Sequence, residues 1–534
     1  MNCKEENASP QVVFVVVLGG DLVRSTEHLG ISYITAVLRK HGAKVEILEI
    51  KDINDIYPIE TLLHWNPKLV GFSLPVTNMG IVINIINLIR SKGYVGHITA
   101  GGHMATFLQN EILTTGVFDS LVNGEGEETV NELWNCIIQQ NDWKLIEGIS
   151  YKVGEKIVVN PARSKINNLD KLPFPARDQF DTHGHSFHYL RISTSRGCFG
   201  GCAFCSAHAM HVSPAWRGRS PENIISEIKN LVRVHKIHTF DFVDSTFEDP
   251  PKEGKARIEK IARLLINSNL KIYFNCCFRA ENWDFSDRPL LKLLSNSGLE
   301  KVNVGLEAGN DRGLKILGKR ATNEDNKRLL LLLREYPEIY LTFGFIMFQP
   351  FVTLSDIRDN IDFLYGTGIG QVSRHYFWRL ELYPATRILE STRKEGLLIG
   401  NYSAVNGMYK YNFQNSGLKK IAEQCSKFLN LKSVWDYEIF DIVLHTFIWR
   451  PLRNYPTNPH LNELLKYTNE SRSMIAKYNK ELLYRIIEGM GEKQLTKEIE
   501  SLDKLLLNEM GKISAIKLRV GLKLMKMGIE VPKR

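Results

Sequence analysis

The chain has 534 residues, of which 43% are hydrophobic and 24% are charged, and its formal net charge is +9. This composition is that of a globular protein, the length excludes a single ordinary domain, and eight cysteines exclude a disulfide framework. The opening MNCKEENASP lacks the apolar region of a secretory signal, and the most apolar stretch, MGIVINIINLIR, is too short to cross a bilayer. We therefore expect a cytoplasmic protein that makes no use of a membrane and keeps its thiols reduced.

The first 140 residues alternate strand and helix signals. Five short apolar runs predict strands, and segments with apolar residues at helical spacing lie between them. The runs are VVFVVVL, KVEILEI, KLVGFSL, HITAGG and a fifth that ends at SLVNGEGEET. Apolar strands separated by helices are typical of a buried parallel sheet with helices on both faces. We predict a Rossmann-like domain over residues 1–145.

The carboxyl ends of these strands are small, polar and glycine-rich. Ligands of parallel sheets bind at that edge, and glycine lets the backbone approach a bulky ligand closely. The ends are Gly19 to Asp21, Ser73 to Thr77, Gly101 to His103 and Asn123 to Glu127. The dinucleotide fingerprint G-x-G-x-x-G is absent after the first strand, so we expect a ligand other than NAD.

A second series of strands and helices follows. Residues 146–187 carry several prolines and no clear period, which predicts a linker. From FHYLRISTSRGC onward, six strands with crossover helices predict a partial (β/α)6 barrel over residues 188–400, with its active site at the strand carboxyl ends. The last expected strand lies in VSRHYFWRLELY. Residues 401–534 are predicted to form a mostly helical domain.

The helical C-terminal region carries most of the net charge. Residues 401–534 hold 22 Lys and Arg against 14 Asp and Glu, a net charge of +8. A solvated basic helical face explains this pattern, and a surface for an anionic substrate or partner is the alternative. We expect no nucleic-acid partner, because interleaved aromatics and a recognisable binding module are missing.

Three cysteines follow the first barrel strand in SRGCFGGCAFCSAH, as Cys198-x3-Cys202-x2-Cys205. Thiolates are soft ligands that suit zinc or an iron–sulfur centre. His208 or His211 could complete a zinc site, although structural zinc ligands usually come as two separated pairs. A [4Fe–4S] cluster ordinarily takes four thiolates, so three leave one iron open to a substrate or cofactor.

This spacing, its place after the first strand of the barrel and the aromatic Phe204 before the last cysteine resemble the radical S-adenosylmethionine (radical SAM) superfamily. The resemblance implies a [4Fe–4S] cluster on the three cysteines whose fourth iron is chelated by the amino and carboxylate groups of S-adenosylmethionine. It implies further contacts to that cofactor from Phe204, Arg279 and Glu307. A salt bridge within the barrel is the alternative for Arg279, and a helix N-terminal acid is the alternative for Glu307.

The preceding domain, with GGHMAT and NGEGEET, and the linker sequence LPFPARD resemble the cobalamin-binding subfamily over roughly residues 10–400. The Asp-x-His-x-x-Gly motif that supplies an axial histidine in other cobalamin proteins is absent. His103 is therefore expected to contact the corrin edge or to be an ordinary loop histidine. The resemblance implies cobalamin contacts from Ser73, Val76, Thr77, Gly101, Gly102, His103, Gly124 and Glu125.

The family resemblance implies an enzyme that methylates an unactivated carbon of a natural-product or peptide substrate through a 5′-deoxyadenosyl radical and methylcobalamin. One alternative keeps both cofactors for a rearrangement, oxidation or cyclisation, and another is a non-catalytic corrinoid or iron–sulfur sensor. The expected partners are a small-molecule or peptide substrate, which the basic region allows to be anionic, and an external electron donor such as flavodoxin or ferredoxin. The FQPFVTLSD turn, which replaces the Pro-Gly-Glu-Thr turn frequent in the family, leaves the substrate class open.

Overall fold

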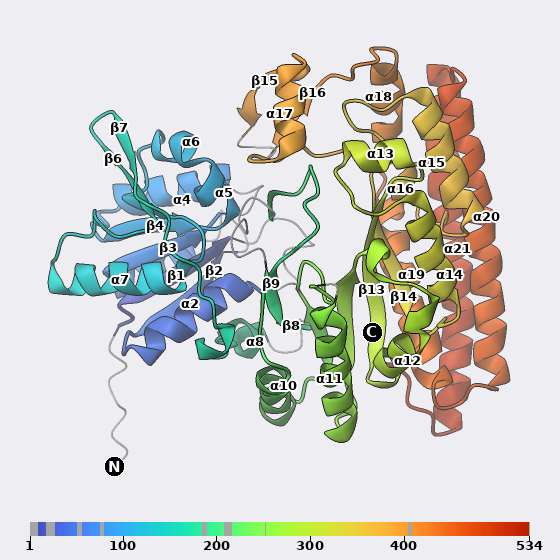
Figure 1. Ribbon diagram of the computed structural model, residues 1–534, viewed down its shortest axis with the longest axis horizontal. Helices are drawn as coiled ribbons and strands as arrows, with labels where there is room; N and C mark the ends of the chain where they lie inside the picture. Colours follow the sequence, from blue (N-terminus) through green and yellow to red (C-terminus); the bar gives the residue numbers. More distant parts are fainter. Residues whose placement is uncertain are drawn as a thin grey trace.

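The computed structural model shows an α/β domain, a second parallel sheet with its helices, and a helical C-terminal region (Figure 1). The residues that it describes are 9–17, 27–50, 56–74, 79–183, 189–207, 216–250, 252–403 and 408–532. None of the helices in these ranges combines the length and the apolar character that a bilayer crossing requires.

The N-terminal sheet has the five parallel strands that the sequence predicts. They run in the order β2 (Val45–Ile50), β1 (Val12–Val17), β3 (Leu69–Ser73), β4 (His97–Gly101) and β5 (Ser120–Val122). The helices between them are α2 (Leu29–Lys40), α3 (Tyr57–Trp65), α4 (Met79–Ser91), α5 (His103–Phe107), α6 (Gln109–Leu113) and α7 (Gly126–Gln139).

Strand β1, which has a neighbour on each side, shows why this sheet is covered on both faces. Its side chains alternate between two apolar clusters, with Val13, Val15 and Val17 in the cluster that contains α3 and α4. Val12, Phe14 and Val16 point the other way, into the cluster that contains α2 and α7. A strand buried on both faces needs a continuous apolar run, and VVFVVV supplies it.

The predicted linker 146–187 is partly wrong, because two of its segments join this sheet. β6 (Ile149–Val153) pairs antiparallel with β5, and β7 (Lys156–Val159) pairs antiparallel with β6. Gly154, at a φ of +57°, makes the tight turn between them. The hairpin covers the edge of the short strand β5, a tertiary role that its half-exposed, weakly apolar sequence does not reveal.

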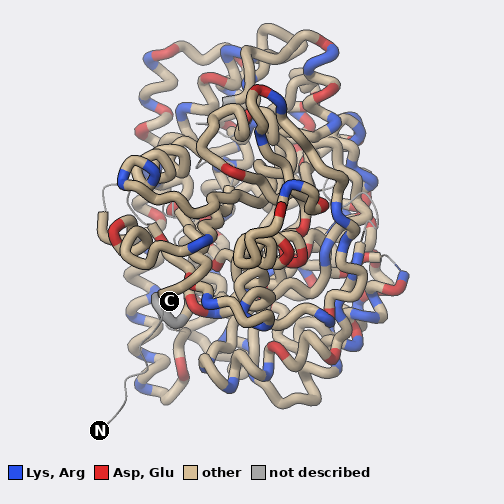
Figure 2. The backbone as a smooth tube through the Cα atoms, turned by 90° about the vertical axis from the view of Figure 1, so that its left-hand side faces the viewer, with Lys and Arg blue, Asp and Glu red and all other residues tan. Residues whose placement is uncertain are grey.

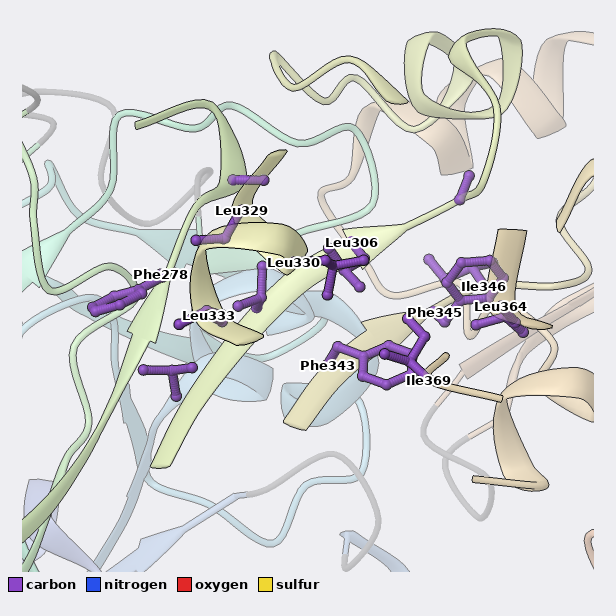
Figure 3. Packing of buried hydrophobic residues seen from close by; sticks show 14 of the residues in the cluster. Phe278, Leu306, Leu329, Leu330, Leu333, Phe343, Phe345, Ile346, Leu364 and Ile369 are labelled. Atoms are coloured by element: carbon purple, nitrogen blue, oxygen red, sulfur yellow. The ribbon is translucent and has the colours of Figure 1, made fainter. Parts of the chain in front are cut away.

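The second sheet holds five parallel strands, flanked on its outer side by helices. The order is β14 (Tyr340–Phe345), β13 (Leu299–Glu307), β12 (Tyr273–Phe278), β11 (Thr239–Phe242) and β8 (Leu190–Ile192). The helices are α10 (Pro221–His235), α11 (Glu253–Asn267), α12 (Arg288–Asn296), α13 (Asp311–Ile316), α14 (Asn323–Arg334) and α15 (Leu354–Gly366). In Figure 3, Leu329, Leu330 and Leu333 of α14 lie against this sheet, close to Leu306 of β13.

The expected sixth barrel strand is not formed within the described residues. Residues 374–377 of that segment make the short helix α16 (Arg374–Phe377), and only an isolated parallel bridge joins Phe348 to Arg379. Phe348 donates its N–H to Trp378 and accepts from Leu380, but Pro350 two residues later has no N–H to continue the ladder. The barrel is therefore an open sheet of five strands extended by one bridge.

The C-terminal region is mostly helical, as predicted, but it begins with a hairpin. Its elements are α17 (Arg387–Lys394), β15 (Leu398–Ser403), β16 (Met408–Tyr411), α18 (Leu418–Phe428), α19 (Lys432–Leu452), α20 (Pro459–Ile487) and α21 (Glu492–Lys526). A buried ion pair between Arg450 of α19 and Glu300 of β13, with two N–O distances of 2.7 Å, ties these helices to the barrel.

The basic charge of this region is partly compensated within its own helices. Lys466 and Lys477 on α20 pair with Glu470 and Glu481 one turn later. Figure 2, which looks at the opposite end of the molecule, likewise shows basic and acidic residues interspersed along the chain. These pairs favour a solvated helical face over a continuous anion-binding surface.

Candidate functional site

The three cysteines lie in a loop that is held at the carboxyl end of the second sheet. The chain leaves β8 and enters the short strand β9 (Ser195–Gly197), which pairs with β10 (Trp216–Gly218). The buried carboxylate of Asp244, just after β11, accepts hydrogen bonds from the backbone N–H groups of Thr194 (2.7 Å) and Ser195 (2.9 Å). Asp244 therefore fixes the start of the segment that presents the thiols.

Polar neighbours surround Cys198. Its sulfur accepts the backbone N–H of Gly200 at 3.1 Å and lies 3.3 Å from the hydroxyl of Thr246. The Arg279 guanidinium lies 3.8 Å from the same sulfur. Donors aimed at sulfur stabilise a thiolate, which is the ligand form of cysteine. This donor set fits an iron–sulfur group bound to the loop.

Cys202 lies in a desolvated environment near two charged side chains. Burial raises the pKa of its thiol to about 11, the positive charge of Lys319 acts in the opposite direction, and the Glu307 carboxylate adds to the rise. Within the described residues, no three His, Cys, Asp or Glu side chains converge on the position of a single ion. A cluster takes one thiolate per iron, so it does not require the three sulfurs to converge on one point.

The zinc alternative rests on two histidines, and both His208 and His211 lie outside the described residues. Phe204 is half-buried and packs against the apolar core of the barrel from within the cysteine loop. Its predicted contact to S-adenosylmethionine stays a prediction.

Glu307 ends β13 beside the cysteine loop and has an unusual backbone. Its φ is +64°, and burial raises the pKa of its carboxyl while nearby Lys319 lowers it. A Cβ added at Gly305 would lie 2.7 Å from one carboxylate oxygen, and one added at Gly344 would lie 3.0 Å from the other. Two strand glycines thus leave the space that this carboxylate occupies, so its position is built into the sheet.

Arg279 follows β12 and is buried among carboxylates. It lies 3.3 Å from Asp249 and 3.3 Å from Glu281, which is the barrel salt bridge that the sequence left open. Its Nε and one oxygen of each carboxylate nevertheless have no hydrogen-bond partner among the described residues. Buried polar atoms that lie near Cys198 and lack a hydrogen bond fit a polar ligand such as an amino acid group. The contact of Arg279 with the methionine carboxylate stays a prediction.

The predicted strand ends of the first domain meet the second sheet at one cavity of about 390 Å³. One wall comes from the N-terminal domain, at Ser73, Gly101, Gly102, His103, Gly124 and Glu125 among others. The opposite wall comes from the second sheet, at Ser193, Ser195, Arg196, Gly197, Val243 and Ser245. The hydroxyl of Ser195 is buried there and has no partner among the described residues. Val76 and Thr77 lie outside the described residues.

Glycine shapes the floor of this cavity. Gly102 has a φ of +101°, and a Cβ there would lie 3.4 Å from the carbonyl oxygen of Leu74. A Cβ at Gly71 would lie 2.6 Å from the ring of Phe14. His103 begins α5 at the cavity, and desolvation lowers the pKa of its ring below the ordinary value. A flat floor without side chains fits a large ring system such as a corrin.

Glu125 has a role that the sequence did not reveal. Its two carboxylate oxygens accept hydrogen bonds from Arg217 at 2.6 and 2.9 Å, and one also accepts the backbone N–H of Ile166. Burial acts to raise the pKa of this carboxyl, but the hydrogen bonds from Arg217 and the charge of Arg196 outweigh it and hold the pKa at about 2. The carboxylate thus ties the two domains together at the wall of the cavity, and its contact with cobalamin stays a prediction.

Two further arginines form ion pairs at the contact between the domains. Arg196, two residues before Cys198, pairs with Glu127 at 2.5 Å. Arg177, from the LPFPARD segment, is buried between Glu27 of the first domain and Glu227 of α10, each at 2.6 Å. We name these and Arg217–Glu125 the interdomain ion pairs. These pairs could not be predicted from the sequence because the two partners lie 50 or more residues apart. The arginines on either side of the cysteine motif were the one sequence feature that pointed to them.

Comparison with known proteins agrees with this geometry. The B12 binding domain model matches residues 15–134, and the radical SAM superfamily model matches residues 192–364. An uncharacterized methyltransferase of Pyrococcus horikoshii is 25% identical over 414 residues. The alignment covers 75% of this chain and 85% of the relative's length. The 4'-phospho-dehydrooxetanocin synthase of Priestia megaterium is 26% identical over 362 residues. That alignment covers 63% of this chain and 48% of the synthase's length.

Among solved structures, the cobalamin-dependent S-adenosylmethionine radical enzyme OxsB with aqua-cobalamin and S-adenosylmethionine bound has a TM-score of 0.73. The two chains are 22% identical, and the alignment covers 98% of this chain and 82% of the OxsB chain, so nearly all of this chain shares a fold with OxsB. The two family matches, joined by the cavity and the cysteine loop, assign cobalamin, S-adenosylmethionine and a [4Fe–4S] cluster as cofactors. The chain is therefore a radical SAM enzyme that carries a B12 binding domain ahead of its radical SAM domain.

Proposed function

We propose that this enzyme transfers a methyl group to an unactivated carbon of a small natural-product or peptide substrate. One observation carries the proposal. The strand ends of the B12 binding domain and the segment that leads into Cys198 line the same cavity, so a corrin and a cluster would face one reaction space. Bound there, the cluster and S-adenosylmethionine supply a carbon-centred radical, and the corrinoid supplies the methyl group.

In this proposal the residues of the second sheet hold S-adenosylmethionine. Cys198, Cys202 and Cys205 bind three irons, Arg279 and Glu307 contact the amino acid and ribose groups, and Phe204 packs beside them. The positions support it, because Arg279 lies 3.8 Å from Cys198 and the Glu307 carboxylate raises the pKa of Cys202. Charged side chains buried at fixed distances can orient a cofactor without reorganising during the reaction.

The first domain contributes the corrin floor in this proposal. Ser73, Gly101, Gly102, His103 and Gly124 would contact the ring through backbone and small side chains. The interdomain ion pairs would keep this floor facing the cysteine loop and would exclude water from the space between. A substrate radical must react with its methyl donor before it reacts with solvent. Excluding water from the space between the domains would therefore protect the methyl transfer.

Radical rearrangement or oxidation without methyl transfer is the second candidate. It is favoured by the 26% identity to the 4'-phospho-dehydrooxetanocin synthase, whose name does not specify a methyl transfer. The methyl-transfer proposal is supported by the similarity to the P. horikoshii relative and to the hopanoid C-3 methylase of Methylococcus capsulatus, which is 26% identical over 316 residues.

Isotope labelling separates the two candidates. Reconstituted enzyme is supplied with S-adenosylmethionine labelled in its methyl group and with candidate substrates from neighbouring biosynthetic genes. We expect one labelled product, with 5′-deoxyadenosine and S-adenosylhomocysteine formed in near-equal amounts. Substrate consumption with 5′-deoxyadenosine but without label in the product would establish the rearrangement candidate instead.

A further inference from the structure

A hollow of about 560 Å³ lies behind the cysteine loop, and it belongs to neither cofactor site. Its apolar centre includes Ala203, Ile316 and Phe351, and its basic residues are Lys315, Arg387 and Lys394. We call it the basic hollow. It shares no lining residue with the cavity between the two domains.

The backbone of the cysteine loop forms part of the wall of the basic hollow. Ala203, between Cys202 and Cys205 in sequence, donates its N–H to Leu317 at 2.8 Å and accepts the N–H of Ile388 at 3.0 Å. Arg387 donates to the carbonyl oxygen of Gly201. A molecule seated here would therefore be separated from the cluster ligands by about one residue of protein.

The hollow presents an excess of positive charge. Lys315 on α13, Arg387 and Lys394 on α17 are exposed, and Glu395 is the single acidic residue among its lining residues. Neither Lys315 nor Lys394 forms an ion pair with another described residue. Basic side chains around apolar residues complement an acidic protein surface in charge.

We infer that the basic hollow is the docking site for an acidic one-electron carrier protein of low potential. The reduced carrier loses one electron, which crosses the Gly201–Ala203 segment and enters the iron–sulfur group, and the oxidised carrier then leaves. The inference rests on the proposed function only in requiring a reducible cluster at the three cysteines. It assigns the reductant and the substrate to separate faces, because the substrate must enter the space between the domains.

Charge reversal tests the inference. The Lys315→Glu/Lys394→Glu variant is compared with wild type and with Lys229→Glu/Lys292→Glu, which makes the same charge change on α10 and α12. In Figure 1 those helices lie at the bottom of the molecule, whereas α13 and α17 lie at the top. Iron content and thermal unfolding establish that all three proteins are folded and loaded.

The readout is the rate of 5′-deoxyadenosine formation with two reductants at low salt. With flavodoxin reduced by its NADPH-dependent reductase, we expect the rate of the hollow variant to fall at least about tenfold and the control to stay near wild type. With dithionite, a small reductant that needs no docking surface, we expect all three proteins to agree. Titration calorimetry of flavodoxin binding should show the same tenfold weakening in the hollow variant alone.

Three outcomes would overturn the inference. These are an unchanged rate with flavodoxin, an equal fall with both reductants, or the same fall in the control variant. An equal fall would mean that the hollow acts on the cluster or on S-adenosylmethionine directly. Product analysis in the dithionite reactions tests methyl transfer separately, so a failure of the proposed function would not be mistaken for a failure of docking.

Discussion

The cysteine loop and the interdomain cavity are built in opposite ways. The loop gathers its three thiols from eight consecutive residues, although side chains from elsewhere in the second sheet, such as Thr246 and Arg279, hold it in place. The cavity draws its walls from residues that span Phe14 to Ser245 in the chain and from two separate sheets. One site is local and the other is an interface.

This difference predicts how each site fails. A local site depends on a few ligands and loses its function when one is removed. An interface site depends on the relative placement of two domains, so residues that touch no cofactor, such as the interdomain ion pairs, determine whether it works. The changes below separate these two behaviours.

Removing one thiol should have the largest effect. Replacing Cys202 with Ala leaves two thiolates, and we expect the brown chromophore to disappear and 5′-deoxyadenosine formation to fall by at least about a hundredfold. Iron analysis and chromatography of the nucleoside measure both. Cys136, on the outer helix α7, is the matched control, and Cys136→Ala should keep its iron. Full iron loading in Cys202→Ala would show that the loop is not the cluster site.

Breaking an interdomain ion pair should act on both the fold and the interface. Glu125 has a native pKa of about 2 against an ordinary 4.5, so its stabilising contribution is present above pH 4.5 and is lost as the pH falls through 2. We expect Glu125→Gln to lower the free energy of unfolding by about 3 kcal/mol at pH 7, with the difference vanishing near pH 2.

Urea unfolding from pH 7 down to pH 2 measures this difference. The neighbouring Glu128 is exposed, so Glu128→Gln should leave the stability unchanged. If Glu125→Gln unfolds like wild type at pH 7 and still binds cobalamin normally, the ion pairs do not hold the interface.

Filling the cavity floor should impair corrin binding without touching the cluster. Gly102→Trp places a large ring where the strand end must stay flat, and we expect cobalamin affinity to fall at least about tenfold while iron content is unchanged. The spectrum after desalting of protein reconstituted with hydroxocobalamin measures binding. Gly93 has a similar φ of +91° but lies in open space, so Gly93→Trp controls for backbone strain.

Crowding the Glu307 carboxylate should give the smallest effect. In Gly305→Ala the added carbon would lie 2.7 Å from the carboxylate and 3.0 Å from the Lys319 amine, so the side chain must move. We expect the Kd for S-adenosylmethionine to rise about three- to tenfold, measured by equilibrium dialysis of cluster-loaded protein. Gly511→Ala, with nothing within 4 Å in α21, should leave that Kd unchanged. Equal affinity in both variants would remove Glu307 from the cofactor site.

The sequence by itself determined those features whose geometry is carried within a short segment. These features are the spacing of the three cysteines, the apolar strands of the first sheet and the glycines at the ends of β4 and β5. Each follows from the residue types and their spacing within one segment. Each could be predicted without knowing what lies beside it.

Only the tertiary structure decided which distant side chains meet. It placed Glu125 against Arg217, set Lys319 beside Glu307, ended the sixth barrel strand at a bridge and added the β6–β7 hairpin to the first sheet. Ion pairs and edge pairings depend on the partner's position in space. A charged or half-exposed residue has the same local signature in a pair as in solvent, and therefore the sequence pattern cannot distinguish the two.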